Sequence, residues 1–524
     1  MLATALTAAS GLLASCAFAP LDLDALAFVA LVPMLVALPR VGPGAAVWLG
    51  WVWCFAYSTR VAGALPHAVE SYFQQPPWAS WALAAAIWTG TGCVYYMVFA
   101  PLYTLLSRRF HAALPWLAAS GWVAAELARG RLWNELDAFV ANPWALLGYA
   151  LPADGLVGQS ASLGGVYLLG FAIVSANAGI AACLLPGRTL GAGRRILPLA
   201  VGAAPALAAA AFGWAKLGAT PPAHAEGAPV ALVQADLELG ARWRRDQYGR
   251  NLAIYVELTR RTLAGAQPAM IYWPEAAMTF FVEEEEEYRA AIAAVLATGE
   301  AELVAGGPAR SETGGEAYNS VFHIDREGSV RGRYDKRHLV PFSEYFPFRG
   351  FDFVRRRFDE VRTFRRGSGD RLLDTPVGRA GVLVCNEALF PEVAARRRAA
   401  GATHLLSPSN DSWIPSAEWA DRMFAFSAYR AVEQRLPVLR VSTSGPSGVI
   451  DAFGRTLVRS EPFSQKVVLG RLPPPEPPSL YARLGDVFAG ACTLAAGVGA
   501  ITALRGGRRR SHTQPSRSSA RSAA

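Results

Sequence analysis

The chain has 524 residues, of which 52% are hydrophobic and only 17% charged, with a formal net charge of +9 and a mean hydropathy of +0.22. This length is too great for one hydrophobic core, so at least two folding units are expected. The apolar composition is typical of membrane proteins, but the charges are unevenly spread, which indicates a membrane part and a soluble part. The positive excess lies in short loops and a C-terminal tail beside apolar segments, which favours membrane topology over binding to nucleic acid.

Nearly uncharged stretches define the candidate membrane spans, since one crossing takes about 20 apolar residues. These stretches are 3–19, 24–39, 44–64, 78–104, 111–127, 161–185, 196–216 and 485–504. The second is short and contains Pro33. We therefore expect a multi-pass α-helical membrane domain of about eight spans. Seven spans belong to residues 1–220 and the eighth to 480–504, and the basic tail 505–524 is expected to be disordered.

Loop charges predict the orientation of these spans. With the N-terminus in the cytoplasm, Arg40, Arg108, Arg194 and the arginines of the C-terminal tail all fall on the cytoplasmic side. This distribution follows the positive-inside rule, with Arg129 and Arg131 as exceptions. Both termini are then cytoplasmic, and the large segment between spans seven and eight lies on the opposite side of the membrane.

That large segment, residues 226–472, has frequent charges and alternating β-rich and helical runs. Strands are expected at 229–237, 269–275, 301–307, 319–325, 379–387, 403–409, 436–443 and 447–453. Helices are expected at 244–266, 284–298, 391–400 and 417–434. The alternation predicts a layered α/β domain inserted before the last span, with catalytic residues favoured at strand ends and in loops.

One cysteine, Cys385, lies in this domain, whereas the other five lie in apolar stretches. No cysteine spacing typical of zinc or of a disulfide framework occurs, so Cys385 is expected to be a free thiol. Three motifs place an ionisable residue after an apolar run: Glu275 in YWPEAA, Lys336 in YDKRHLVPFSEYFPF and Cys385 in LVCNEALFPE. Each alone is a weak signal, because a loop carboxylate, a surface lysine and an inert buried thiol are the ordinary interpretations. Pairing Cys385 with His338 or His404 has no supporting motif.

Together, and in this order, the three motifs resemble the nitrilase superfamily, whose members use a Glu–Lys–Cys set in an α-β-β-α sandwich. The resemblance implies that Glu275 is the general base, Cys385 the nucleophile and Lys336 the cation that holds the charge of the tetrahedral intermediate. The charge of Lys336 should also favour the thiolate. Glu344 and Glu387 are candidate orienting carboxylates, and a plain structural role is equally open for each. No metal or other cofactor is implied.

Nearly the whole chain resembles one membrane-embedded branch of that superfamily, the bacterial apolipoprotein N-acyltransferases. The likeness includes FAPLDLDALAFVALVPMLVAL near the start, ANPWALLGYAL at 141–151, GGVYLLGFAIVSANAGIA at 164–181 and SNDSWIPSAEWADRMFAFSAYRAVEQRLPVLR at 409–440. It implies that Cys385 takes an acyl chain from a phospholipid as a thioester and passes it to the α-amino group of an S-diacylglyceryl cysteine on an apolipoprotein. It also implies a monomer in the bacterial inner membrane, with a periplasmic catalytic domain and no nucleic-acid partner.

Two other functions remain open at this point. A membrane-tethered carbon–nitrogen hydrolase would act on a small amide, with water as acceptor and activity in 226–472 alone. A non-catalytic scaffold is disfavoured because all three motif residues are present. The chain departs from the acyltransferase pattern at Asn386, in NDSWIPS at 410–416 and in STSGPSG at 442–448, which bears on substrate preference more than on reaction class. The Phe-rich loop 338–354 is interpreted either as an acyl-chain portal or as a packed loop.

Overall fold

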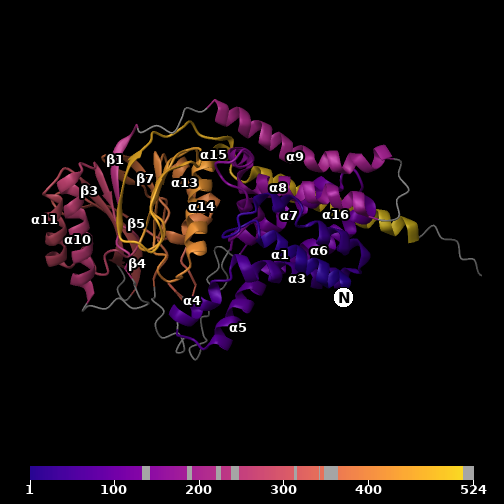
Figure 1. The fold of residues 1–524 in the computed structure, drawn as a ribbon, viewed down its shortest axis with the longest axis horizontal. Helices are drawn as coiled ribbons and strands as arrows, with labels where there is room; N and C mark the ends of the chain where they lie inside the picture. The colour runs from indigo at the N-terminus through magenta and orange to yellow at the C-terminus, as the bar shows by residue number, and fades with distance from the viewer. Residues whose placement is uncertain are drawn as a thin grey trace, which may run out of the picture.

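The computed structural model describes residues 1–72, 74–132, 142–185, 192–219, 226–237, 247–311, 316–341, 343–346 and 364–511. These residues form two parts that lie side by side (Figure 1). One is a helical bundle, built from the helices of residues 2–219 and the C-terminal helix. The other is a two-sheet domain, built from residues 228–472.

The helical bundle consists of apolar helices connected by short turns. Its α-helices are α1 (Leu2–Ser15), α2 (Val32–Ala37), α3 (Pro43–Val61), α4 (Leu65–Tyr72), α5 (Pro77–Trp88), α6 (Val94–Arg109), α7 (Leu114–Arg131), α8 (Ala161–Leu184), α9 (Ala192–Gly218) and α16 (Val487–Ser511). Its shorter turns are η1 (Asp24–Phe28), η2 (Leu38–Arg40), η3 (Thr89–Cys93), η4 (Leu147–Ala150) and η5 (Gly158–Ser160).

Within the described residues, four helical runs are long and apolar enough to cross a membrane. They are Pro77–Arg109, Gly158–Leu184, Ile196–Gly218 and Val487–Arg505. Each coincides with a predicted span. The other four predicted spans do not meet this criterion of length and composition, so the count of eight stays a prediction.

Residues 24–39 do not form the single helix predicted for the second span. They form η1, α2 and η2 in succession. Pro33 lies in the first turn of α2 and Pro39 in the first turn of η2. Proline lacks a backbone N–H and is favoured in the first turn of a helix, so each of these two prolines lies where a new turn begins.

The C-terminal helix also differs from its prediction. Residues 480–504, predicted as one helix, contain α15 (Leu480–Leu484) and most of α16, separated at Gly485, whose φ is +60°. This left-handed conformation ends α15 and is available to glycine without steric cost. The α16 helix continues to Ser511, and 512–524 lie outside the described residues, so disorder of the tail stays a prediction.

The two-sheet domain contains a pair of six-stranded sheets. One sheet has the order β12 (Lys466–Leu472), β1 (Ala228–Gln234), β2 (Met270–Tyr272), β3 (Glu302–Arg310), β4 (Ala317–Ile324) and β5 (Val330–Asp335). The other has the order β11 (Thr456–Arg459), β10 (Gly448–Ile450), β9 (Val438–Ser442), β8 (His404–Ser409), β7 (Gly378–Val382) and β6 (Leu373–Thr375). The strands β1–β2–β3 and β7–β8–β9 are parallel and central. All eight predicted strands are present, and the four unpredicted strands, β5, β6, β11 and β12, are the edge strands of the two sheets.

Helices cover both outer faces of the sheet pair, which gives the predicted α-β-β-α layers (Figure 1). The first sheet is covered by α10 (Tyr248–Gly265) and α11 (Glu286–Leu296), and the second by α13 (Pro391–Ala399) and α14 (Ala417–Gln434). Buried side chains such as Leu232 and Leu439 fill the space between the sheets. The α13–α14 layer packs against the helical bundle, because Phe426 of α14 and Trp144 of the bundle belong to one continuous core.

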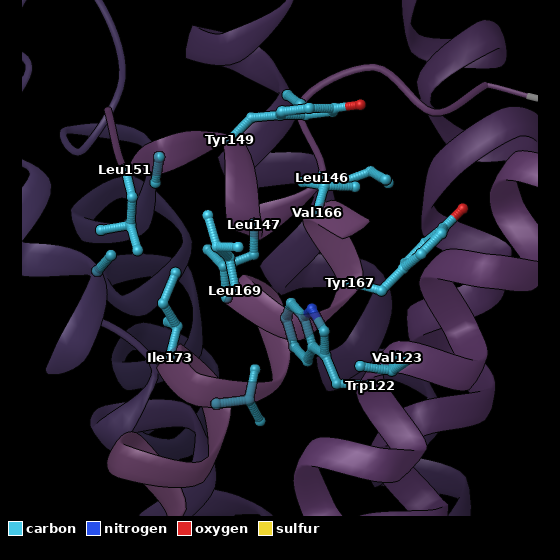
Figure 2. Close-up of a cluster of buried hydrophobic side chains, with 14 of the residues drawn as sticks. Trp122, Val123, Leu146, Leu147, Tyr149, Leu151, Val166, Tyr167, Leu169 and Ile173 are labelled. Carbon is cyan, nitrogen blue, oxygen red and sulfur yellow. The ribbon is translucent and has the colours of Figure 1, made fainter. Parts of the chain in front are cut away.

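A cluster of large buried side chains joins α7, η4 and α8 (Figure 2). Trp122 of α7, Leu147 of η4 and Leu169 of α8 point toward one another in it, and each is almost completely buried. Tyr149, also of η4, lies at the edge of this cluster, and its hydroxyl accepts a hydrogen bond from Arg430 of α14 at 2.9 Å. Tyr149 thereby connects the apolar core of the bundle to a polar side chain of the two-sheet domain.

The contact between α3 and α6 leaves no room for a side chain at Gly50. A Cβ added there would lie 2.2 Å from the carbonyl oxygen of Tyr96. We predict that Gly50→Ala lowers the thermal midpoint of the detergent-solubilised protein, with a loss of about 1–3 kcal/mol from forced overpacking.

Gly44→Ala in the same helix is the matched control, because a Cβ there meets nothing within 4 Å. Alanine favours a helix over glycine, so this variant should be as stable as the native protein or slightly more stable. Equal midpoints for the Gly50 and Gly44 variants would contradict the α3–α6 contact.

Candidate active site

The three motif residues follow strands of both sheets and meet at one cavity. Glu275 follows β2, Lys336 directly follows β5, and Cys385 follows β7. The Lys336 Nζ lies 3.1 Å from Glu275 Oε1. The carboxyl ends of parallel strands are a common place for ligand sites, because the loops that leave them converge there. The structure therefore places together the three side chains that the motifs singled out.

Cys385 is held in an unusual backbone conformation. Its φ is +51°, in the left-handed region that costs a non-glycine residue about 1–2 kcal/mol. This sharp turn leads from β7 into the short helix η8 (Cys385–Leu389). The carboxylate of Glu387 accepts the Val384 N–H at 2.8 Å and so braces the turn. A strained backbone that persists must be held by its surroundings, and such positions occur frequently at active sites.

Lys336 lies between two carboxylates. Its Nζ is 2.9 Å from Glu344 Oε2, in addition to its contact with Glu275. The amide nitrogen of Asn319 donates to the same two residues, to Glu275 Oε1 at 2.7 Å and to Glu344 Oε1 at 2.6 Å. Glu344 also accepts the Val340 N–H at 2.7 Å. This geometry fits Glu344 as a residue that orients Lys336 and Glu275.

The electrostatics of the site keep its lysine charged and its thiol neutral. Burial alone would lower the pKa of Lys336, but the charges of Glu275 and Glu344 outweigh it and raise that pKa well above its usual range. Burial, followed by the negative charge of Glu275, raises the pKa of Cys385. Lys336 lowers this pKa and so favours the thiolate, as expected, but burial and Glu275 outweigh it. With the pKa of the thiol raised, a base that takes its proton during the reaction is needed.

Glu387 lies behind the nucleophile rather than in the cavity. Its carboxylate accepts hydrogen bonds from the Tyr334 hydroxyl at 2.8 Å and from the backbone N–H groups of Arg337 and His338 at 2.9 and 3.1 Å. Burial would raise its pKa, but the hydrogen bond and charge of His338, together with Arg397, outweigh burial and lower the pKa to about 2. Glu387 thus ties the Cys385 turn to the segment that follows Lys336.

The cavity has a volume of about 420 Å³, part of it open to solvent. It is lined by Glu275, Ala276, Asn319, Lys336, Val340, Ser343, Glu344, Cys385, Asn410 and Trp413. Asn386, His338 and His404 are not among these lining residues. Of the proposed portal loop 338–354, Val340, Ser343 and Glu344 line the cavity, whereas 342 and 347–354 lie outside the described residues.

Two contributors were missed by the sequence motifs. Asn319 lies on β4, in a run that the sequence analysis interpreted only as a strand. Its polar side chain is buried there, and a polar residue within a strand run was the one sign in the sequence that it could belong to the site. Asn410 acts through its backbone, whose N–H donates to Glu275 Oε2 at 2.9 Å. A backbone donor has no side-chain signature, so no motif could have revealed this contact.

Comparisons with known proteins match both parts of the chain. Residues 229–476 match the family model for carbon-nitrogen hydrolases, and residues 10–179 match that for the apolipoprotein N-acyltransferase N-terminal domain. The apolipoprotein N-acyltransferase of Geobacter metallireducens is 30% identical over 512 residues, covering 95% of this chain and 94% of that protein. The enzyme of the same name from Azotobacter vinelandii is 30% identical over 510 residues, covering 91% and 90%.

We predict a stability contribution from Glu387 that depends on pH. A carboxylate whose pKa is lowered on folding stabilises the protein above its unfolded pKa and loses that effect as the pH falls through its folded pKa. The free energy of unfolding of the native protein should exceed that of Glu387→Gln by roughly 3 kcal/mol at neutral pH. The difference should shrink as the pH falls from about 4.5 toward about 2.

Thermal midpoints of the detergent-solubilised proteins, measured from neutral to acidic pH, test this prediction. Glu300→Gln is the control, because this exposed carboxylate should change stability by less than about 0.5 kcal/mol. If the difference in stability between the native protein and Glu387→Gln does not change with pH, the lowered pKa assigned to Glu387 is wrong.

Proposed function

We propose that this chain, which belongs to the apolipoprotein N-acyltransferase family, transfers an acyl chain from a membrane phospholipid to the α-amino group of the S-diacylglyceryl cysteine of apolipoproteins. The transfer would pass through a thioester on Cys385 and would complete lipoprotein maturation. The relatives' names support the reaction class. The observation that carries the mechanism is the cavity in which Glu275, Lys336 and Cys385 meet.

The first half-reaction forms the acyl-enzyme. The Cys385 sulfur attacks the ester carbonyl of the phospholipid while its proton passes to Glu275, whose charge acts most strongly on the thiol. Lys336 and the backbone N–H after the nucleophile stabilise the oxyanion of the tetrahedral intermediate. The ester C–O bond then breaks, and the lysophospholipid leaves with the proton that Glu275 returns. The products are a thioester on Cys385 and a lysophospholipid with a free hydroxyl group.

The second half-reaction transfers the acyl group to nitrogen. The neutral α-amino group of the apolipoprotein attacks the thioester carbonyl, and Glu275 accepts its proton. The C–N bond forms, the C–S bond breaks, and the proton returns to the sulfur of Cys385. The transfer changes neither the net charge nor any oxidation state, because the donor ester already carries the acyl group in an activated form. Water must be kept from the thioester, because its attack would turn the enzyme into a phospholipase.

In this proposal the helical bundle lies in the bacterial inner membrane, with both termini cytoplasmic and residues 226–472 periplasmic. The four apolar helical runs and the positions of the loop arginines support this placement. The continuous core between α14 and the bundle would hold the catalytic domain at the membrane surface. Both substrates carry acyl chains in the bilayer, so a site at that surface is required. We propose that the monomer is sufficient for this reaction.

A carbon–nitrogen hydrolase acting on a small amide would use the same three side chains. Transfer is favoured because the similarity to the acyltransferases extends through residues 10–179 of the helical bundle, which hydrolysis of a small amide does not need. The hydrolase alternative also makes a different product, since water rather than an amine would release the acyl group.

We predict that the purified protein, given phospholipid labelled in its acyl chain, acquires label on Cys385 as a hydroxylamine-sensitive thioester. Adding a diacylglyceryl-cysteinyl peptide should move the label to the peptide amine. Cys385→Ala should acquire none, and Glu275→Gln and Lys336→Ala should label at least about 100-fold more slowly, because each removes a proton acceptor or an oxyanion partner.

Labelled peptide and acyl-enzyme are measured separately, which distinguishes the two candidate functions. Release of free fatty acid with no labelled peptide would favour the hydrolase. Label on the Cys385→Ala protein would remove this residue from the mechanism. A Glu275 or Lys336 variant with a near-native labelling rate would remove that residue alone.

A further inference from the structure

A buried ion pair lies behind the cavity wall, between β9 and the segment that follows β8. Arg440 of β9 donates from Nη2 to Asp411 Oδ2 at 2.7 Å, and both side chains are almost completely inaccessible to solvent. Neither side chain lines the cavity. Replacing a buried ion pair by apolar residues is often neutral or stabilising, so stability alone is a weak reason for a charge pair here.

The Asp411 carboxylate connects two segments of the domain. The hydroxyl of Ser409 donates to its Oδ1 at 2.8 Å, and the hydroxyl of Ser442 donates to its Oδ2 at 2.8 Å. Ser442 in turn accepts the Gly445 N–H at 3.0 Å. A Cβ at Gly445 would lie 2.0 Å from Asp411 Oδ2, so only glycine admits the carboxylate. Asp411 therefore joins the turn after β8 to the turn after β9.

Both of these turns hold Glu275. Asn410, the residue before Asp411, donates its N–H to Glu275 Oε2 at 2.9 Å. Thr443, the residue after Ser442, donates its hydroxyl to the backbone carbonyl of Glu275 at 3.4 Å. The side chain and the backbone of the proposed base are thus each held by a residue adjacent to the Asp411 network.

We infer that Asp411, Arg440 and Ser442 form a positioning device for Glu275. The inference rests on the proposed function, because it assigns a role in the same acyl transfer. The network fixes the Asn410 N–H against one carboxylate oxygen, which leaves the other oxygen with Lys336 and Asn319. A base held in this way keeps the orientation it needs to accept the thiol proton, and misplacement by about 1 Å is known to cost up to about 100-fold in rate.

This role accounts for two sequence runs that the three motifs leave unexplained. Asp411 belongs to NDSWIPS and Ser442 to STSGPSG, the two runs that depart from the acyltransferase pattern. In the structure the two runs meet at the Asp411 carboxylate. Trp413 of the first run also lines the cavity, so the same anchor holds a wall of the site and its base.

Two buried serines provide a matched test. Ser442 donates to Asp411 and accepts the Gly445 N–H, whereas Ser460 donates to Gln234 at 2.7 Å and accepts the Ser447 N–H at 2.8 Å. Each alanine variant therefore loses a hydroxyl that both donates and accepts, at a site almost free of solvent. Of the two, only Ser442→Ala removes a direct bond to Asp411, since Ser460 is linked to Ser442 through Ser447, whose hydroxyl accepts the Ser442 N–H at 3.0 Å.

The measurement is single-turnover labelling of Cys385 by phospholipid labelled in its acyl chain, over a range of donor concentrations. Ser442→Ala should lower the maximal acylation rate about fivefold, the factor expected for one hydrogen bond of about 1 kcal/mol, with an unchanged half-saturating donor concentration. Ser460→Ala should keep the native rate. Asp411→Asn, if folded by its thermal midpoint, should be slower than Ser442→Ala because the Arg440 charge is left unpaired.

The possible failures are distinguishable. A native acylation rate for Ser442→Ala, or equal slowing by Ser442→Ala and Ser460→Ala, would overturn the positioning role while leaving the proposed function intact. A change in half-saturating donor concentration alone would assign Ser442 to donor binding and likewise overturn it. Absence of label on native Cys385 would instead overturn the proposed function, and this inference with it.

Discussion

The docking of α14 onto the helical bundle is the contact on which the rest of the structure depends. Arg430 and Glu433 of this helix form a buried ion pair, with Arg430 Nε 3.0 Å from Glu433 Oε2. Glu433 also accepts the Val166 N–H at 3.0 Å, an N–H that becomes available because α8 departs from helical geometry at Gly164 and Gly165. Buried charges are costly unless their hydrogen bonds are also made, and sliding α14 along the bundle would break the bond from the Val166 N–H to Glu433 and the bond from Arg430 to the Tyr149 hydroxyl. These contacts between α14 and the helical bundle therefore fix the position of the two-sheet domain.

The same helix reaches the nucleophile. Arg430 donates through Nη1 to the carbonyl of Leu389 at 3.3 Å, and Leu389 is the last residue of η8, the helix that begins at Cys385. At its other end, Arg422 donates to the carbonyls of Val61, at the end of α3, and Ala19. A cation at a helix C-terminus is stabilised by the helix dipole and by the free carbonyls there. One rigid helix thus relates the end of α3 to the turn that holds the proposed nucleophile.

The site itself combines a neutral thiol with charged partners that are already in place. Glu275, Glu344 and Lys336 are fixed by one another and by Asn319, so they need little rearrangement when charge develops on the substrate. A thiol kept neutral by burial reacts poorly with incidental electrophiles, because the thiolate is the nucleophile. In the proposed reaction, the nucleophile would therefore be activated only when a donor ester is bound.

Local sequence patterns were enough to predict the two-part organisation, the central strands and the three motif residues. The central strand β1 is an almost continuous apolar run because most of it is buried, whereas peripheral strands such as β5 and β11 are half exposed and carry no such pattern. The arrangement of Asn319, the Asn410 N–H and Asp411 around Glu275, and the raised pKa of the buried Cys385 thiol, follow from the tertiary fold alone. Those properties depend on burial and on contacts between segments up to 168 residues apart, as between Glu275 and Thr443. A local sequence pattern contains neither kind of information.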